Sequence, residues 1–167
     1  MPADALLPQE ISELAQRVIE ENGQSGRKVV LAESCTGGLV SAALTDIPGS
    51  SKVFERGFVT YSNEAKMQSL GVSQDIIETF GAVSVACAWA MAKGALEHSE
   101  ADVAVAISGI AGPGGGTELK PVGTVVFARV IRGEDVPPDG ELRHFNSDSR
   151  SEIRRQATLC ALELLLP

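Results

Sequence analysis

The sequence predicts an α/β fold: a three-layer α/β/α sandwich around a mixed, mostly parallel sheet of about five strands. Short apolar runs alternate with segments whose apolar residues recur at helical spacing, a pattern typical of parallel strands joined by helices. Two consecutive strands joined by a Pro/Gly-rich segment follow near the C-terminus, and they add at least one antiparallel strand. The chain has 167 residues, of which 44% are hydrophobic, so we expect one domain over residues 1–167.

The first half of the chain is expected to alternate between helix and strand. Apolar residues from Ile11 onward fall on one helical face, and glycine readily ends such a helix. The expected elements are a first helix ended by Gly23 and Gly26, a strand at 28–33, a helix at about 37–47, a strand at 54–61, and a short helix that begins near Ser62 and stops at Gly71.

The second half contains three helical segments that follow a serine, whose hydroxyl can cap the free N–H groups of a helix. An apolar run at 103–107 is typical of a strand buried on both faces. The expected elements are a short helix from Ser73 to Thr79, an Ala-rich helix at 85–98 after Ser84, the strand at 103–107, strands at 122–131 and 141–145 around an exposed turn at 133–140, and a last helix from Ser149 to Leu165.

Charge and composition exclude several classes of protein. The net charge of −8 argues against a nucleic-acid partner, which requires a basic face. No apolar run approaches the ~20 residues that span a bilayer, and the N-terminal residues do not resemble a secretion signal. Three cysteines at wide spacing predict neither a disulfide framework nor a metal site, and the acidic residues form no ligand cluster. We therefore expect a cytoplasmic protein without a metal.

Three loops follow expected strands, at 33–38, 61–66 and 108–117. If these strands are parallel neighbours, the loops open on the same sheet edge, where α/β proteins bind ligands. The first loop carries Ser34 at a strand-to-helix turn, so Ser34 is either a helix cap or an exposed nucleophile. Cys35 is the rival nucleophile, because a helix N-terminus lowers a thiol pKa. Its alternative role is that of a small buried residue that packs the turn.

A serine nucleophile needs a base within hydrogen-bond reach. His98 closes a helix and His144 lies in a late strand, so a Ser-His-Asp triad has little support. Lys66 is the better candidate, because the segment from Tyr61 to Lys66 leaves a strand and enters a helix, which lets both side chains face one cleft. The ordinary lysine pKa of about 10.4 must then be lowered, by burial or by a nearby cation such as Arg150.

The glycine-rich loop at 109–116 has two interpretations. Its N–H groups can turn inward and hold a phosphate, or its glycines can let the chain pass close to a ligand. It matches neither the P-loop nor the dinucleotide-binding pattern. Lys120 and Arg56 are candidates for additional positive charge beside a bound anion.

Several motifs together resemble the CinA C-terminal domain family. They are Ala32-Glu33-Ser34-Cys35-Thr36-Gly37-Gly38, Val59-Thr60-Tyr61-Ser62-Asn63-Glu64-Ala65-Lys66, Gly109-Ile110-Ala111-Gly112-Pro113-Gly114-Gly115 and Lys120-Pro121-Val122-Gly123-Thr124-Val125. The likeness covers nearly the whole chain, which looks like the stand-alone form. The family includes nicotinamide-nucleotide amidases. The resemblance therefore implies hydrolysis of nicotinamide mononucleotide to nicotinic acid mononucleotide and ammonia, in pyridine nucleotide recycling and without a cofactor.

The resemblance also implies roles for individual residues. Ser34 is the nucleophile, and Lys66 and Tyr61 complete the catalytic set. The implied substrate-binding residues are Cys35, Thr36, Gly37, Gly38, Ser108, Gly112, Gly114, Gly115 and Arg150. Relatives commonly read Phe-x-Gly-Asp-Arg before the last helix. This chain reads Phe145-Asn146-Ser147-Asp148-Ser149-Arg150, one residue longer and without the glycine, so the basic residue corresponds to Arg150 or Arg154.

Two further expectations concern the mechanism and its alternatives. The N–H groups at 35–38 are expected to stabilise an oxyanion, and the loop at 112–117, with Arg150 or Lys120, to hold the substrate phosphate. The partners expected are a small nucleotide and, by resemblance, further copies of the chain. The alternatives are a non-catalytic nucleotide-binding module linked to competence or DNA damage, and an amidase for another small amide.

Overall fold

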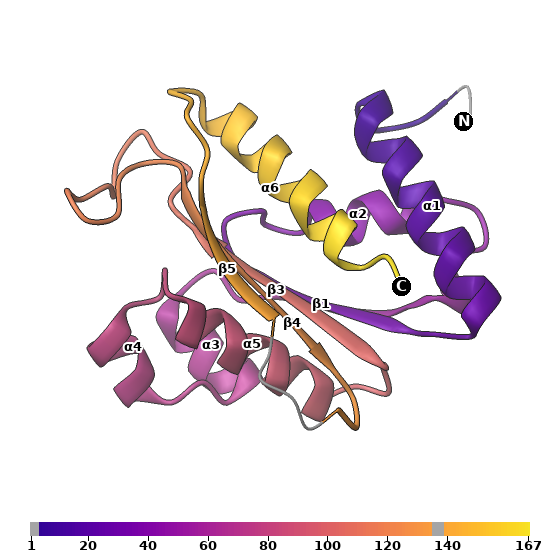
Figure 1. Cartoon of the computed structure of the whole chain (residues 1–167), viewed down its shortest axis with the longest axis horizontal. Coiled ribbons are helices and arrows are strands. Elements are labelled where there is room, and N and C mark those ends of the chain that lie inside the picture. The colour runs from indigo at the N-terminus through magenta and orange to yellow at the C-terminus, as the bar shows by residue number, and fades with distance from the viewer. Residues whose placement is uncertain (1–3, 135–138) are drawn as a thin grey trace.

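The computed structural model describes residues 4–134 and 139–167, and within them a single five-stranded sheet crosses the molecule (Figure 1). The strands are β1 (Val29–Glu33), β2 (Phe54–Val59), β3 (Val103–Gly109), β4 (Thr124–Ile131) and β5 (Asp139–His144), in the order β2-β1-β3-β4-β5. β1 runs parallel to β2 and β3, whereas β4 is antiparallel to β3 and β5. The predicted mixed sheet is confirmed, and the carboxyl ends of its three parallel strands share one edge.

Helices cover both faces of the sheet, which confirms the three layers (Figure 1). One face carries α1 (Gln9–Ser25), α2 (Leu39–Thr45) and α6 (Arg150–Leu164), and the other carries α3 (Asn63–Leu70), α4 (Gln74–Phe80) and α5 (Val85–Glu97). Alternate side chains of β1 serve the two layers, because successive strand residues point to opposite faces. Leu31 belongs to the apolar core under α1 and α6, whereas Val30 and Ala32 belong to the core under α5.

Serine caps fix the starts of four helices, and the sequence predicts three of them, Ser73, Ser84 and Ser149. The Oγ atoms of Ser62, Ser73, Ser84 and Ser149 accept hydrogen bonds from backbone N–H groups in the first turns of α3, α4, α5 and α6. Each bond pairs an N–H group that has no partner within its helix. The caps thereby set the residue at which each helix begins.

Several predicted boundaries were wrong. Gly23 does not end α1, which continues to Ser25 and closes at Gly26 in the left-handed conformation (φ 68°). The second helix begins at Leu39 rather than near 37, because Gly37 and Gly38 have positive φ angles that no helix contains. β2 ends at Val59, so the two residues after it leave the sheet, and their carbonyl groups are free for other partners. Residues 135–138 of the turn predicted at 133–140 lie outside the described part, and its last two residues belong to β5, which begins at Asp139 rather than at 141.

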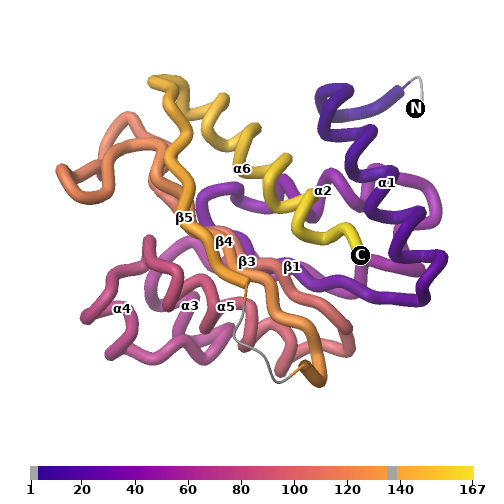
Figure 2. The backbone as a smooth tube through the Cα atoms, viewed as in Figure 1, coloured from indigo at the N-terminus to yellow at the C-terminus, as the bar shows by residue number. Residues whose placement is uncertain are grey.

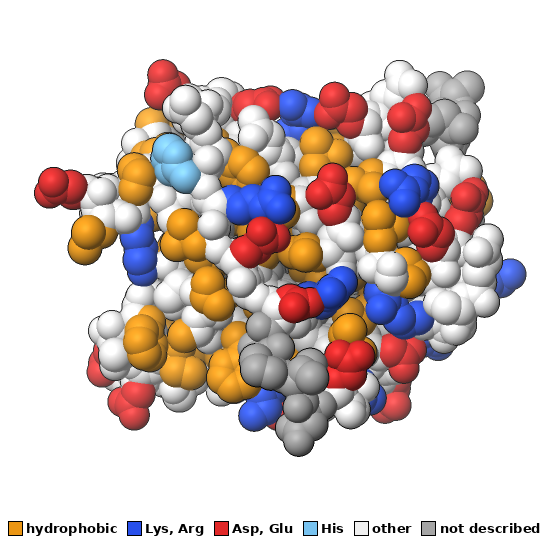
Figure 3. Space-filling model, in the orientation of Figure 1, with side chains coloured by type: hydrophobic (Ala, Val, Ile, Leu, Met, Phe, Trp, Pro, Cys, Tyr) orange, Lys and Arg blue, Asp and Glu red, His pale blue; other side chains and the backbone are white. Residues whose placement is uncertain are grey.

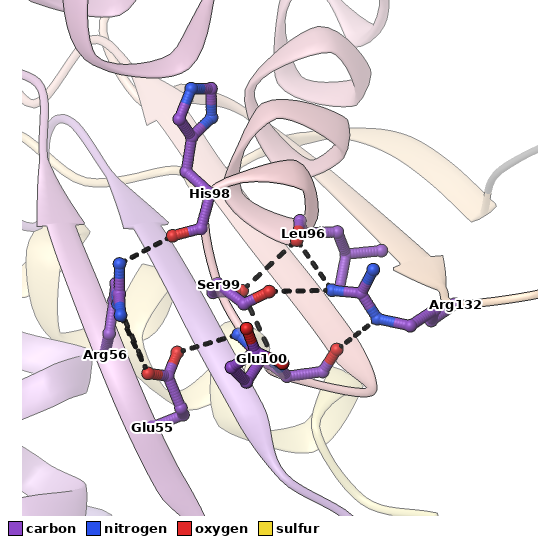
Figure 4. A network of polar contacts seen from close by, with 8 residues as sticks. Glu55, Arg56, Leu96, His98, Ser99, Glu100 and Arg132 are labelled. Atoms are coloured by element: carbon purple, nitrogen blue, oxygen red, sulfur yellow. Dashed lines mark hydrogen bonds and ion pairs between the residues drawn. The ribbon is translucent and has the colours of Figure 1, made fainter.

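A polar network fastens the end of the sheet opposite to the three predicted loops (Figure 4). Arg132, just after β4, donates to the carbonyl oxygen of Leu96 in the last turn of α5. It also donates to the carbonyl oxygens of Ser99 and Ala101 in the connection from α5 to β3. Arg56 on β2 donates to the His98 carbonyl oxygen at the end of α5. These contacts satisfy carbonyl groups that a helix end leaves without partners.

The face of the molecule in Figure 3 carries basic and acidic side chains interspersed over α6 and β5, without a large patch of one sign. Arg129 pairs with Asp139, and Arg155 pairs with Glu152 and Glu10. None of the helices described is long and apolar enough to cross a membrane. In residues 4–134 and 139–167, no group of three or more His, Cys, Asp or Glu side chains is arranged to hold a metal ion.

Candidate active site

The three predicted loops meet at the carboxyl ends of β1, β2 and β3 and line a cavity of about 260 Å³. The loop after β3 passes beside the start of α6, which closes the cavity from the opposite layer (Figure 2). The residues that line the cavity are Ser34, Cys35, Tyr61, Asn63, Lys66, Ala82, Val83, Ser108, Gly109, Ile110, Ala111, Gly112, Gly114, Gly115 and Arg150. The predicted site residues absent from its wall are Thr36, Gly37 and Gly38.

At the base of the cavity, Lys66 Nζ lies 3.0 Å from Ser34 Oγ. Ser34 leaves the end of β1, and its own N–H donates to the Ile107 carbonyl oxygen of β3 at 2.9 Å. Lys66 lies in the first turn of α3, which Ser62 caps. The serine and the lysine are both buried, with 7% and 1% of their surface exposed. The structure therefore joins a hydroxyl and an amine that are 32 positions apart.

Two backbone carbonyl groups fix the direction of the Lys66 amine. Nζ donates to the carbonyl oxygens of Thr60 at 2.8 Å and Tyr61 at 3.2 Å, the two residues that leave the sheet after β2. A neutral amine has two N–H donors and one lone pair. With both donors engaged, the lone pair is left for the Ser34 hydroxyl.

Burial lowers the pKa of the Lys66 ammonium from its ordinary value. The desolvated charge is the cause, since a buried ammonium loses its hydration. No carboxylate lies within 4 Å of Lys66 Nζ in the described part of the chain, so no ion pair counteracts this effect. Both the direction of the pKa shift and the contact with Ser34 suit a general base.

In the turn after β1, some backbone N–H groups are hydrogen-bonded within the turn and others are not. The Gly37 N–H donates to the Ser34 carbonyl oxygen, and the Gly38 N–H donates to the Glu33 carboxylate. Their prediction as oxyanion donors is therefore wrong, because both N–H groups are already bonded within the turn. In the described residues the N–H groups of Cys35 and Thr36 bond no other residue, and they are the donors that remain. Cys35 lines the cavity, and Thr36 follows it in the turn.

Glu33 holds this turn from within, a role that the sequence did not reveal. Its buried carboxylate accepts hydrogen bonds from five groups, which are Thr36 Oγ1, Gly38 N, Val40 N, Ser41 N and Ser41 Oγ. These groups include the unpaired N–H donors at the start of α2, which carry partial positive charge. A carboxylate at the last position of a buried strand, directly before a Ser-Cys-Thr-Gly-Gly turn, was the available signal.

Arg150, rather than Arg154, reaches the cavity. Its guanidinium donates to the Gly112 carbonyl oxygen at 2.6 Å and to the Tyr61 hydroxyl oxygen at 3.0 Å. The extra residue before α6 therefore does not move the arginine away from the cavity. Tyr61 is 61% exposed, and its hydroxyl contacts Arg150 while its carbonyl contacts Lys66. Ser34 and Lys66 touch directly, so a proton can pass between them without the Tyr61 hydroxyl.

Other predicted candidates lie in different surroundings. Burial raises the pKa of the Cys35 thiol to about 11, so the thiol stays protonated at neutral pH. The His98 ring bonds to its own helix, and His144 bonds to the Val122 carbonyl oxygen outside the cavity. Arg56 belongs to the network at the opposite end of the sheet, so its placement beside a bound anion was wrong.

Lys120 also lies off the cavity wall, where its ammonium donates to the Phe80 carbonyl oxygen. The cavity wall also includes residues that the sequence analysis did not single out as site residues. Asn63 begins α3, and Ala82 and Val83 precede α5. The Asn63 side chain was predictable from its place in the Tyr61–Lys66 motif. The two apolar residues carry no chemical signal of their own.

The chain is similar to known proteins over nearly its whole length. A 51% identical relative from Escherichia coli K12, over 157 residues and 93% of both chains, is named nicotinamide-nucleotide amidohydrolase PncC. A CinA-like protein of Akkermansia muciniphila is 49% identical over 92% of this chain, which spans 36% of that relative. The crystal structure of the competence/damage inducible protein CihA from Agrobacterium tumefaciens superposes with a TM-score of 0.89, at 50% identity and 96% coverage of both chains.

The family model of the CinA C-terminal domain matches residues 11–167, from the third residue of α1 through the last helix. The chain belongs to the CinA C-terminal domain family.

Proposed function

We propose that this protein hydrolyses the carboxamide of nicotinamide mononucleotide to nicotinic acid mononucleotide and ammonia. The observation that carries the proposal is the 3.0 Å contact between Ser34 Oγ and the buried Lys66 amine inside a cavity of ligand size. The relative named nicotinamide-nucleotide amidohydrolase, at 51% identity over 93% of the chain, supports the choice of substrate. The reaction would return a pyridine nucleotide to recycling.

The mechanism that we propose begins with neutral Lys66. Its lone pair takes the proton of Ser34, and Ser34 Oγ attacks the carboxamide carbon to form a tetrahedral intermediate. The N–H groups of Cys35 and Thr36 stabilise the oxyanion, each well-aimed donor contributing about 3 kcal/mol. The Lys66 ammonium then gives its proton to the leaving nitrogen, so that ammonia departs and an ester remains on Ser34.

Water completes the cycle. Lys66, neutral again, takes a proton from a water molecule that attacks the ester, and the proton then returns to Ser34 Oγ as the acid leaves. The pyridinium ring of the substrate withdraws electrons from its carboxamide, which makes this amide a suitable target for a serine. One amide and one water give one acid and one ammonia.

The phosphate of the substrate is assigned to the loop at 112–115 and to Arg150. A protein of net charge −8 requires a local cation for an anionic substrate, and Arg150 is the arginine on the cavity wall. Guanidinium groups bind phosphate through two parallel hydrogen bonds. Arg150 would exchange its contact with the Gly112 carbonyl or the Tyr61 hydroxyl for the phosphate.

The direct test is turnover by the purified chain. We expect equal amounts of ammonia and nicotinic acid mononucleotide from nicotinamide mononucleotide, measured by a coupled ammonia assay and by chromatography. Saturable binding of the nucleotide without any product would instead support the binding module linked to competence or DNA damage. Ammonia from a panel of other small amides, but none from this nucleotide, would support a different amidase.

A further inference from the structure

Arg154 contacts the nucleophile turn from the face of the sheet opposite to Lys66. Its Nε donates to the Cys35 carbonyl oxygen at 3.0 Å, and its Nη2 donates to the Thr36 carbonyl oxygen at 3.2 Å. The arginine lies one helical turn along α6 from Arg150 but does not line the cavity. One guanidinium thus holds two consecutive peptide groups, directly after the nucleophile.

The planarity of the peptide bond gives this contact a consequence on the far side of the turn. In a trans peptide the C=O and N–H bonds point in opposite directions. The carbonyl of Cys35 points to Arg154 on the α6 side, so the N–H of Thr36 in the same peptide group points away from α6. That is the side from which α3 brings Lys66 to Ser34.

The N–H of Thr36 is one of the two donors in this turn that bond no other residue. A hydrogen bond from a cation to a carbonyl oxygen also polarises the peptide, which strengthens its N–H as a donor. The Gly37 N–H bond to the Ser34 carbonyl oxygen closes the turn around this peptide group, and Glu33 bonds the Thr36 hydroxyl and the N–H groups from Gly38 onward. None of these bonds is made by the Cys35 carbonyl or the Thr36 N–H, so Arg154 is the side chain that contacts the peptide group itself.

Arg154 also differs from its neighbour in what it binds. Arg155 forms ion pairs with Glu152 and Glu10 on the surface. No carboxylate lies within 4 Å of the Arg154 guanidinium in residues 4–134 and 139–167. Its positive charge is therefore directed at the two carbonyl groups of the turn, and a Cβ built on Gly37 would lie 3.3 Å from its Nη2, which shows how closely the two approach.

We propose that Arg154 is a positioning residue for the oxyanion site: it clamps the Cys35–Thr36 peptide so that the Thr36 N–H faces the reacting carbonyl oxygen. This role rests on the proposed amide hydrolysis by Ser34. Arg154 touches neither substrate nor Ser34 Oγ, and it acts through the backbone alone. Its removal should therefore lower kcat and leave KM nearly unchanged, because the donor is required when negative charge develops.

The test compares Arg154→Met and Arg154→Lys with Arg155→Met, the matched loss of one charge on the same helix. We expect kcat for nicotinamide mononucleotide to fall about tenfold to a hundredfold in Arg154→Met, the range that misplaced donors and reactants produce. Arg154→Lys keeps the charge but cannot bridge both carbonyl groups, so an intermediate kcat is expected even if the methionine variant does not fold. Arg155→Met should keep the wild-type kcat. Thermal unfolding of all variants separates positioning from loss of fold.

A second measurement does not depend on the substrate. A fluorophosphonate probe labels an activated serine through an intermediate that the same donors stabilise, and intact mass reports the labelling rate. Slower labelling of Ser34 in folded Arg154→Met supports the clamp even if the wild type releases no ammonia from the nucleotide, in which case only the proposed substrate fails. Wild-type kcat and labelling rate in the folded Arg154 variants, or a raised KM with unchanged kcat, would overturn the clamp.

Discussion

Lys66 Nζ and Ser34 Oγ lie 3.0 Å apart because two neighbouring parallel strands end at the same edge of the sheet. Ser34 follows β1 directly, and Lys66 follows β2 after a short turn into α3. The early end of β2 frees the carbonyl groups of Thr60 and Tyr61, which hold the amine in place. The geometry of the catalytic pair thus follows from strand length and from the cap of one helix.

Replacement of Lys66 by methionine should remove activity while the fold remains. A general base contributes about 10² to 10⁴ in rate, so kcat should fall by that factor. The side chain is 1% exposed and methionine fills about the same volume, so the fold should remain, with a loss of about 1–2 kcal/mol in the free energy of unfolding because the carbonyl groups of Thr60 and Tyr61 lose their donor. The exposed Lys93→Met in α5 is the control and should match the wild type in both measurements.

Activity should rise with pH through the lowered pKa of Lys66. Only the neutral amine accepts the Ser34 proton, so kcat/KM should increase to a plateau with a midpoint below the ordinary lysine pKa of 10.5. A profile whose rise is centred at or above that value would contradict a buried base.

The same group should affect stability over the same pH window. Between the folded pKa and 10.5, the unfolded chain binds a proton at Lys66 that the folded chain does not. The free energy of unfolding contributed by this group therefore increases with pH across that window. Denaturant unfolding at several pH values should show this increase in the wild type, and Lys66→Met should lack it.

Replacement of Arg150 by methionine should weaken binding of the phosphate. Hydrogen bonds to a charged group contribute about 1.5–3 kcal/mol, which corresponds to a roughly 10- to 150-fold higher KM for the nucleotide. Nicotinamide riboside, which lacks the phosphate, should be affected much less. Lys120→Met is the comparison, because it tests the other candidate cation. An equal or larger increase in KM for that variant would contradict the assignment of the phosphate to Arg150.

Replacement of Glu33 by glutamine should weaken both the turn and the fold. The carboxylate is fully buried and accepts five hydrogen bonds. In glutamine an NH₂ group replaces one oxygen, and this group cannot accept hydrogen bonds from the N–H and O–H donors of the turn. We expect the free energy of unfolding to fall by about 2 kcal/mol or more, together with kcat. Chemical denaturation measures the first effect, and exposed Glu97→Gln should show neither.

Replacement of Arg132 by methionine should destabilise the protein without changing its kinetics. The guanidinium serves three carbonyl oxygens at the end of the sheet remote from the cavity (Figure 4). The loss should be about 1–2 kcal/mol, because the side chain lies near the surface. Urea unfolding should reveal it while kcat and KM stay at wild-type values, and a changed KM would mean that the two ends are coupled.

Much of the fold was predictable because its signals are local. Alternating apolar runs indicated the strands, serine caps indicated three helix starts, and Gly26 and Gly71 marked two helix ends. Gly23 misled because a glycine in mid-helix costs only about 1 kcal/mol, which packing of the helix overrides. The second helix was placed two residues too early, since sequence alone does not show that both glycines of the turn have positive φ.

The site was predictable only as a set of loops. Three strands that end at one edge gave the meeting of Ser34, Lys66 and the glycine loop, which the structure shows. Hydrogen-bond partners were not predictable, because they depend on tertiary approach: the Gly37 and Gly38 N–H groups are already bonded, and the carboxylate of Glu33 organises them. The sequence offered Arg154 only as an alternative to Arg150, and its contact with the turn depends likewise on tertiary approach.

The most direct measurement is ammonia release from nicotinamide mononucleotide by Ser34→Ala beside Cys35→Ala, with each variant shown to be folded by thermal unfolding. Loss of release in Ser34→Ala, with Cys35→Ala within a few-fold of the wild type, is the expected result. Release at the wild-type rate by Ser34→Ala, or its loss only in Cys35→Ala, would contradict a serine nucleophile paired with Lys66.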